Sequence, residues 1–142
     1  MREGLLATVL EAELELCRTD PSLSLPGIAF ELHGSKILAR FSKGRDGKPG
    51  VFQLDCSEFD ANPPSVAMID FESWAELTLE RWTPGVPHSI HPVTGRPFVC
   101  LQGIAEYHTH PSHVADSWDR YRKRFRIPQT VRRLLQKAGA IP

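Results

Sequence analysis

The chain has 142 residues and a formal net charge of zero, with 41% hydrophobic and 24% charged residues. This length and composition indicate one globular domain, spanning residues 1–142, that can bury a core of its own. Its apolar runs are too short to cross a bilayer, and zero net charge favours neither nucleic acid nor a membrane as a partner. We therefore expect no membrane partner and no nucleic-acid partner.

The first segment, MREGLLATVLEAELELC, predicts an amphipathic helix. It carries glutamates where a secretory signal stays uncharged, which indicates a cytoplasmic protein. Its apolar stripe has helical spacing and consists of Leu6, Leu10, Leu14 and Cys17. The helix should end before Pro21. Three cysteines form neither an even disulfide set nor a CxxC metal pair, so free thiols in a reducing compartment are expected.

Four apolar runs with alternating pattern follow the helix and predict an antiparallel meander. They are GIAFELHG, KILARFSKG, VFQLDCSEF and SVAMIDF. A Gly-Ser turn joins the first two into a hairpin, and the glycine-rich loop 44–50 and Pro63-Pro64 separate the others. Cys56 falls on an apolar face, so we expect it in the core together with Cys17.

The second half of the chain has a less regular pattern. Residues 72–85, ESWAELTLERWTPG, are compatible with a short helix or with an additional hairpin. Residues 84–111 predict an ordered irregular loop that holds Cys100. A final helix is indicated by the apolar stripe from Thr130 to Ala138. The expected fold class is therefore α+β, with an N-terminal helix, a four-stranded antiparallel meander, an irregular loop and a C-terminal helix.

This order of elements and motifs resembles the ubiquitin-conjugating enzymes, which carry ubiquitin-like proteins. Residues 62–66 (NPPSV) resemble the Pro-Pro-x-Val stretch that opens the fourth strand of that family. His91-Pro92 resembles the start of its His-Pro-Asn signature, and residues 99–101 (VCL) resemble the Ile-Cys-Leu around its active-site cysteine. Trp118 and the final helix resemble the elements that follow that cysteine. The resemblance spans most of the chain and implies a UBC-like fold with an active-site loop around Cys100.

The resemblance also implies a function. Cys100 is expected to accept a ubiquitin-like protein as a thioester from an activating enzyme and to pass it to an acceptor protein. No cofactor is expected, because the chain has no phosphate-binding glycine loop and ATP use therefore belongs to the activating enzyme. Compact versions such as this one resemble bacterial members encoded in operons linked to phage defence. The alternative is a catalytically inactive relative that only binds a ubiquitin-like protein or an activating enzyme.

The family's first helix meets the activating enzyme. The resemblance therefore predicts that the face with Glu11, Glu13 and Glu15 docks against basic residues of that partner.

Two departures from the family concern the active-site loop. Val93 replaces the asparagine that stabilises the oxyanion, and residues are added between Cys100 and Trp118, including YHTHPSH. His91 is expected to shape the loop through hydrogen bonds. If the added segment is extended, His108 and His110 project to the same side and can act as base or oxyanion donor in place of the asparagine.

The same segment admits other interpretations. Three histidines, His108, His110 and His113, can ligate zinc with Asp116 or Cys100 as a fourth ligand, although no metal is expected, or they can form an exposed polar loop. Asp116 and Asp119 can pair with an incoming lysine, and Asp116 can equally cap a helix.

The range Arg120 to Lys137 holds eight of the seventeen basic residues and no acidic residue. It indicates a solvated basic face or a surface for an acidic partner, and nucleic-acid binding through it predicts affinity that falls steeply with salt.

Overall fold

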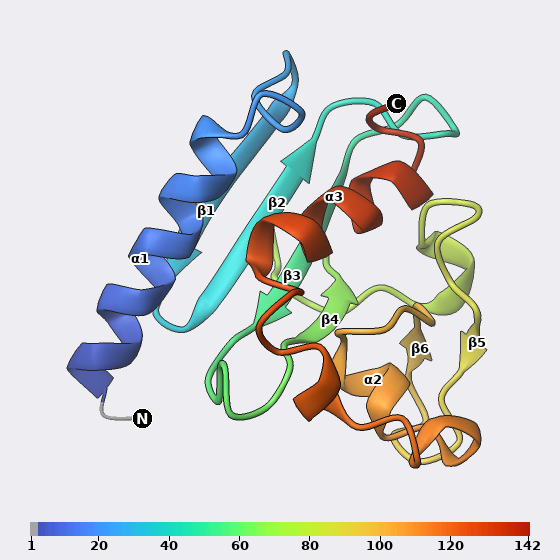
Figure 1. Ribbon diagram of the computed structural model, residues 1–142. Coiled ribbons are helices and arrows are strands. Elements are labelled where there is room, and N and C mark those ends of the chain that lie inside the picture. Colours follow the sequence, from blue (N-terminus) through green and yellow to red (C-terminus); the bar gives the residue numbers. More distant parts are fainter. Residues whose placement is uncertain (1–2) are drawn as a thin grey trace.

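The structure is a computed structural model that describes residues 3–142. Helix α1 (Glu3–Thr19) precedes a four-stranded antiparallel sheet in the order β1-β2-β3-β4, and helix α3 (Ile127–Lys137) ends the fold (Figure 1). The strands are β1 (Ile28–His33), β2 (Lys36–Phe41), β3 (Gly50–Asp55) and β4 (Ser65–Met68). The predicted α+β class, the meander and both terminal helices are confirmed.

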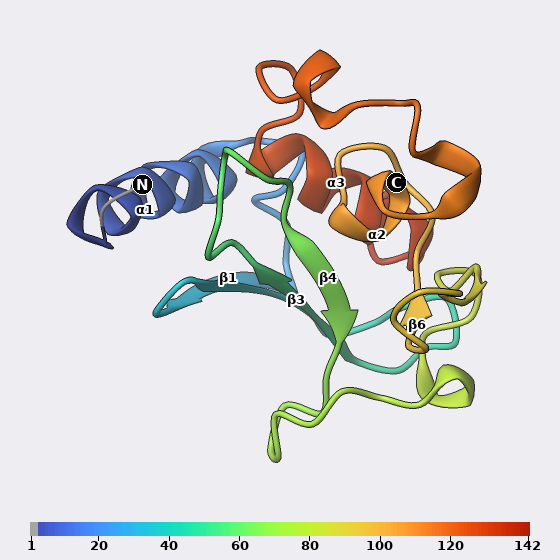
Figure 2. The ribbon, with the colours of Figure 1, turned by 90° about the horizontal axis from the view of Figure 1, so that it is seen from below.

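Helix α1 buries the stripe that its sequence predicts. Leu10 and Cys17 are fully buried and Leu14 is 5% exposed, because these positions recur on one helical face. The helix ends at Thr19, before Pro21 as expected. Figure 2 shows α1, α3 and the short helix α2 (Ala105–His108) on the same side of the sheet, so the main core lies between these helices and the strands.

The sheet separates two apolar clusters of different size. Alternate residues of β2, such as Ile37 and Ala39, belong to the main core, whereas Leu38 belongs to a smaller cluster with Val51 and Ile69. Successive side chains of a strand point to opposite faces, so the smaller cluster lies on the face away from the helices. The segment that follows β4 runs along this second face (Figure 2).

Residues 72–85 combine parts of both predicted alternatives. Glu76 forms an isolated antiparallel bridge with Ile69, and the 3₁₀ turn η1 (Leu79–Arg81) follows. Trp82 is buried, and its indole N–H donates to the carbonyl oxygen of Leu77 at 3.1 Å. Neither a full helix nor a full hairpin forms.

The loop expected over residues 84–111 is ordered, but it is not free of regular structure. It contains the two-stranded hairpin of β5 (Ser89–Ile90) and β6 (Pro97–Phe98), followed by α2. Elements of two to four residues are shorter than the window in which a hydrophobic period can be recognised. The sequence could therefore not predict them.

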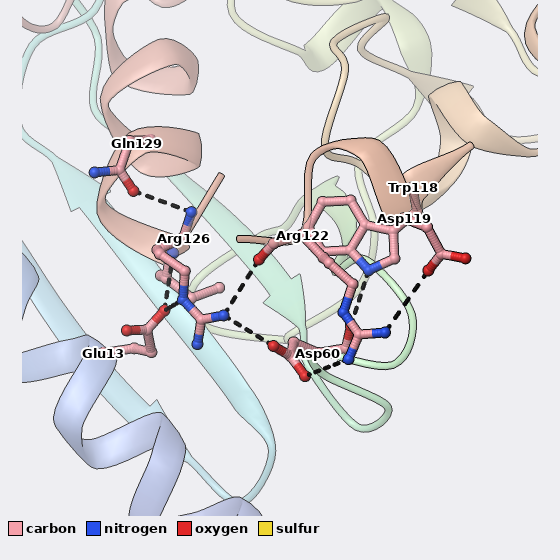
Figure 3. Close-up of polar contacts among 8 residues, drawn as sticks. Glu13, Asp60, Trp118, Asp119, Arg122, Arg126 and Gln129 are labelled. Atoms are coloured by element: carbon pink, nitrogen blue, oxygen red, sulfur yellow. Dashed lines mark hydrogen bonds and ion pairs between the residues drawn. The ribbon is translucent and has the colours of Figure 1, made fainter. Parts of the chain in front are cut away.

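An ion pair between the half-buried Arg126 and the buried Glu13 joins the start of α3 to α1 (Figure 3). The Arg126 Nε–H donates to Glu13 Oε1 at 3.0 Å, and the backbone N–H of Ile127 donates to the same oxygen at 3.2 Å. Arg126 also donates to Asp60 at 2.9 Å. The Glu13 side chain is only 6% exposed, so it does not belong to the surface predicted to dock on a partner, whereas Glu11 and Glu15 are exposed. The prediction that Glu13 lies on the docking surface is therefore wrong.

The basic range near the C-terminus is largely paired within the chain. The arginines with a carboxylate partner are Arg120, Arg122, Arg126 and Arg132. Arg133 donates to the carbonyl oxygen of Gln102 and lies 4.6 Å from the Phe125 ring centroid. The range is therefore not one continuous solvated basic face. No helix within residues 3–142 has both the length and the apolar composition needed to cross a bilayer.

Candidate active site at Cys100

Cys100 lies two residues after the end of β6, where the chain leaves the core. The two residues before it, Phe98 and Val99, are fully buried and anchor the strand. Cys100 itself is partly exposed, whereas Cys17 and Cys56 are buried as predicted. Of the three thiols, that of Cys100 is the one that another molecule can reach.

The local environment favours the protonated form of the Cys100 thiol. Burial raises the pKa of its thiol above the ordinary value of 9.0, and the ammonium group of Lys137 near the end of α3 opposes this effect in part. Deeper burial raises the pKa of Cys17 to about 12. Since the thiolate is the nucleophile, Cys100 needs a neighbouring group that removes the S–H proton during attack.

His113 provides an imidazole at this position. Its Nε2 atom lies 3.8 Å from the Cys100 Sγ atom, within hydrogen-bonding distance for sulfur. The ring stacks on Tyr107 with centroids 4.2 Å apart, which fixes its orientation. With the proton on Nδ1, Nε2 can accept the thiol proton.

The sequence interpretation gave the role of base or oxyanion donor to His108 and His110, not to His113. The three residues Pro111–His113 form a 3₁₀ turn, η2, with Pro111 at its start and the His110 ring accepting a hydrogen bond from Ser112 N–H at 3.1 Å. The sequence did contain a signal for this turn, the proline that follows His110, since proline favours the first position of a helical turn. This turn brings His113 to the cysteine.

His108 lies in α2, so the segment is not extended at this point as the hypothesis required. Its Nε2 accepts a hydrogen bond from the backbone N–H of Gly103 at 3.0 Å, and its Nδ1–H donates to the carbonyl oxygen of Asp116 at 2.7 Å. Both ring nitrogens are therefore occupied in holding the loop together. The geometry supports a structural contribution from His108.

His110 packs against the rings of Phe98 and His91, with centroids 5.7 and 5.6 Å away. Burial lowers the pKa of His110, and the neighbouring imidazoles of His91, His113 and His88 lower it further. Both effects favour the neutral form of the His110 ring. His108 and His110 do not share one face, because one lies in α2 and the other opens the next turn.

His91 is fully buried and shapes the hairpin between β5 and β6. Its Nδ1 atom accepts hydrogen bonds from the backbone N–H groups of Val93 at 3.1 Å and Thr94 at 3.2 Å. Its Nε2–H donates to the carbonyl oxygen of Glu106 at 2.9 Å. These hydrogen bonds match the loop-shaping contribution of His91 that the sequence suggested. Val93, which takes the place of the family's asparagine, is 67% exposed.

Asp116 organises the loop on the other side of Cys100. Its carboxylate accepts hydrogen bonds from the Tyr107 and Tyr121 hydroxyls at 2.7 Å and from the Gln102 amide at 3.1 Å. The tyrosine hydrogen bonds lower the pKa of Asp116. Because these donors already surround it, Asp116 is not available to an incoming lysine. Asp119, in contrast, is 78% exposed and pairs with Arg122 at 3.7 Å.

The two tyrosines of the chain report directly on this network. Hydrogen bonding to Asp116 raises the pKa of both Tyr107 and Tyr121 above the ordinary value of 10.0. We expect ultraviolet titration of tyrosinate to have its midpoint above pH 10, and Asp116→Asn to move the midpoint back toward 10. A folded state with a raised tyrosine pKa loses stability as pH rises above 10, so the free energy of unfolding should fall with alkali from that pH upward. An ordinary midpoint in the parent protein would contradict the network.

The zinc interpretation finds no support in the geometry. Within residues 3–142, no group of three or more His, Cys, Asp or Glu side chains is arranged to hold a metal ion.

Comparison with known proteins adds one finding. A family model described as Y4jH-like, Y4jH family, matches residues 89–126. This range contains Cys100, His113 and Asp116, but it leaves α1, the four-stranded sheet and α3 unmatched. No curated protein matches the chain. The similarity to the Y4jH family is therefore limited to the segment that forms the candidate site.

Proposed function

We propose that this protein is a carrier of a ubiquitin-like protein, with Cys100 as the thioester-forming residue. The observation that carries the proposal is the partly exposed Cys100 thiol with the His113 Nε2 atom 3.8 Å away. The order of helix, antiparallel sheet, cysteine loop and final helix, which resembles that of ubiquitin-conjugating enzymes, supports it further. The bacterial phage-defence setting belongs to the same proposal.

The chemistry of loading uses both residues. Cys100 Sγ attacks the thioester carbonyl carbon on the activating enzyme while its proton passes to His113 Nε2. A new C–S bond to Cys100 forms, the C–S bond to the activating enzyme breaks, and the departing sulfur takes up a proton. The raised pKa of Cys100 makes the free thiolate scarce, so the proton acceptor His113 contributes to the attack.

Helix α1 is the proposed docking surface for the activating enzyme. Glu11 and Glu15 are exposed there, and Leu16 is an exposed apolar residue of the same helix at 52%. Complementary surface charge acts mainly on the rate of encounter. In this proposal Glu13 does not take part.

The test is loading of the protein by a bacterial activating enzyme and its ubiquitin-like protein in the presence of ATP. The parent protein should form a conjugate that thiol reductant removes, and Cys100→Ala should form none. Cys100→Ser should form an oxygen ester that resists reductant but not alkali. Cys17→Ala and Cys56→Ala are matched controls that should load normally. A conjugate on Cys100→Ala would overturn the assignment.

The second candidate is an inactive binding module for a ubiquitin-like protein or an activating enzyme. Two observations favour it, namely the exposed Val93 in place of the asparagine and the raised pKa of Cys100. It predicts that the two partner proteins bind the parent protein and Cys100→Ala equally well and that neither forms a conjugate.

A further inference from the structure

We infer that the group that accepts the acyl chain from Cys100 is a hydroxyl and not a lysine amine, with His113 as the base that removes the hydroxyl proton. This inference rests on the proposed function, because it concerns the fate of the Cys100 thioester.

Two basic residues of α3 act on the Cys100 loop. Lys137 is the charged residue that acts on the Cys100 thiol, and it favours the anionic form. One helical turn earlier in α3, the Arg133 guanidinium donates to the carbonyl oxygen of Gln102, two residues after the cysteine. The Nη1 atom of Arg133 is buried and has no hydrogen-bond partner among residues 3–142. A lysine ammonium group that approaches Cys100 therefore meets like charge.

Two carboxylates of the surrounding loop are already occupied, and the exposed Asp119 pairs with Arg122 at 3.7 Å. Asp116 accepts hydrogen bonds from Tyr107, Tyr121 and Gln102, and it pairs with Arg120 at 3.6 Å. Glu106 is 6% exposed, and its two oxygens accept from the Ser65 hydroxyl and the Val66 N–H. Neither carboxylate can hold a lysine or take its proton without breaking these bonds.

A hydroxyl group avoids both difficulties. It is neutral, so Lys137 and Arg133 do not repel it, and it needs only a base near the thioester. His113 lies at hydrogen-bonding distance from the sulfur that leaves. In the reaction the acceptor oxygen bonds to the carbonyl carbon and the C–S bond to Cys100 breaks. The hydroxyl proton moves to His113 Nε2 and then to the Cys100 sulfur, which restores the resting thiol.

The test uses protein preloaded on Cys100 and separated from ATP and activating enzyme. Nα-acetyl-threonine amide and Nα-acetyl-lysine amide, at equal concentrations, then serve as acceptors that differ only in the side chain. The threonine probe should discharge the thioester faster and give a product that hydroxylamine cleaves. Lysine transfer gives a hydroxylamine-resistant amide. Faster transfer to lysine would overturn the inference but leave the carrier proposal intact, whereas failure to load Cys100 would overturn the carrier proposal itself.

Two variants test the separate parts of the inference. His113→Ala should slow discharge to threonine about a hundredfold and abolish most of its pH dependence, as expected for loss of a general base. Lys137→Gln should speed discharge to the lysine probe, because it removes the like charge. The rate of discharge to the threonine probe should change little. His33→Ala, a change on the exposed end of β1, is the matched histidine control. Equal threonine rates for the parent protein and for folded His113→Ala, checked by thermal unfolding, would exclude His113 as the base.

Discussion

Replacement of Arg126 by alanine is expected to lower the free energy of unfolding by about 3 kcal/mol, the lower end of the usual cost of breaking a buried ion pair, because the Arg126 side chain is 31% exposed. The variant leaves the Glu13 carboxylate, only 6% exposed, with the Ile127 N–H as its remaining donor. It also removes the hydrogen bond to Asp60, so three segments of the chain lose a common contact (Figure 3). Urea unfolding followed by tryptophan fluorescence measures the loss.

The double variant Glu13→Gln with Arg126→Ala separates the ion pair from the rest of the cluster. It should be more stable than Arg126→Ala alone, because no unpaired charge remains buried. Lys123→Ala, at an exposed position of the same basic range, should change stability by no more than about 0.5 kcal/mol. An Arg126→Ala loss no larger than that of Lys123→Ala would show that the ion pair does not join α1 and α3 in solution.

The His91→Ala variant is expected to be destabilised by about 2 to 4 kcal/mol, since it removes a buried ring and three hydrogen bonds. The backbone N–H groups of Val93 and Thr94 and the carbonyl oxygen of Glu106 all lose their partner. The two amides should also exchange their hydrogens faster, which mass spectrometry or NMR can follow.

The His113→Ala variant is expected to lose much less stability than His91→Ala. Its ring is half-buried and stacks on Tyr107, so His113→Ala should cost about 1 kcal/mol or less in stability while strongly affecting transfer. If His91→Ala kept full stability and lost activity, His91 would have to act in the chemistry and not in the shape of the loop.

Strong periodicity explains why much of the fold could be predicted. The stripe of α1, the β1–β2 hairpin and the stripe of α3 all recur over enough residues to define a buried face. The sequence also contained an overlooked signal at Glu13. Leu10, Glu13, Leu14 and Cys17 follow helical spacing, so the glutamate lies on the buried face, where a carboxylate requires a partner. That partner, Arg126, is distant in sequence and could not be inferred from a local pattern.

The candidate site could be predicted in part. The motif order singled out Cys100, and the apolar pattern correctly placed the other two cysteines in the core. The expectation that residues 107–113 are extended was wrong, and the roles of the three histidines in this segment stay predictions. The four-residue helix α2 and the turn at Pro111 redirect the chain, and tertiary contacts with Gly103 and Asp116 fix His108. Such contacts leave no periodic trace in the sequence.

The most direct measurement of the central claim is the intact mass of the protein after incubation with the activating enzyme, the ubiquitin-like protein and ATP. The account predicts one added ubiquitin-like protein, joined with loss of water, on the parent chain. Neutral hydroxylamine should restore the original mass, and peptide mapping should place the thioester at Cys100. A parent protein that keeps its original mass, although the activating enzyme is itself loaded and binds it, would contradict the account.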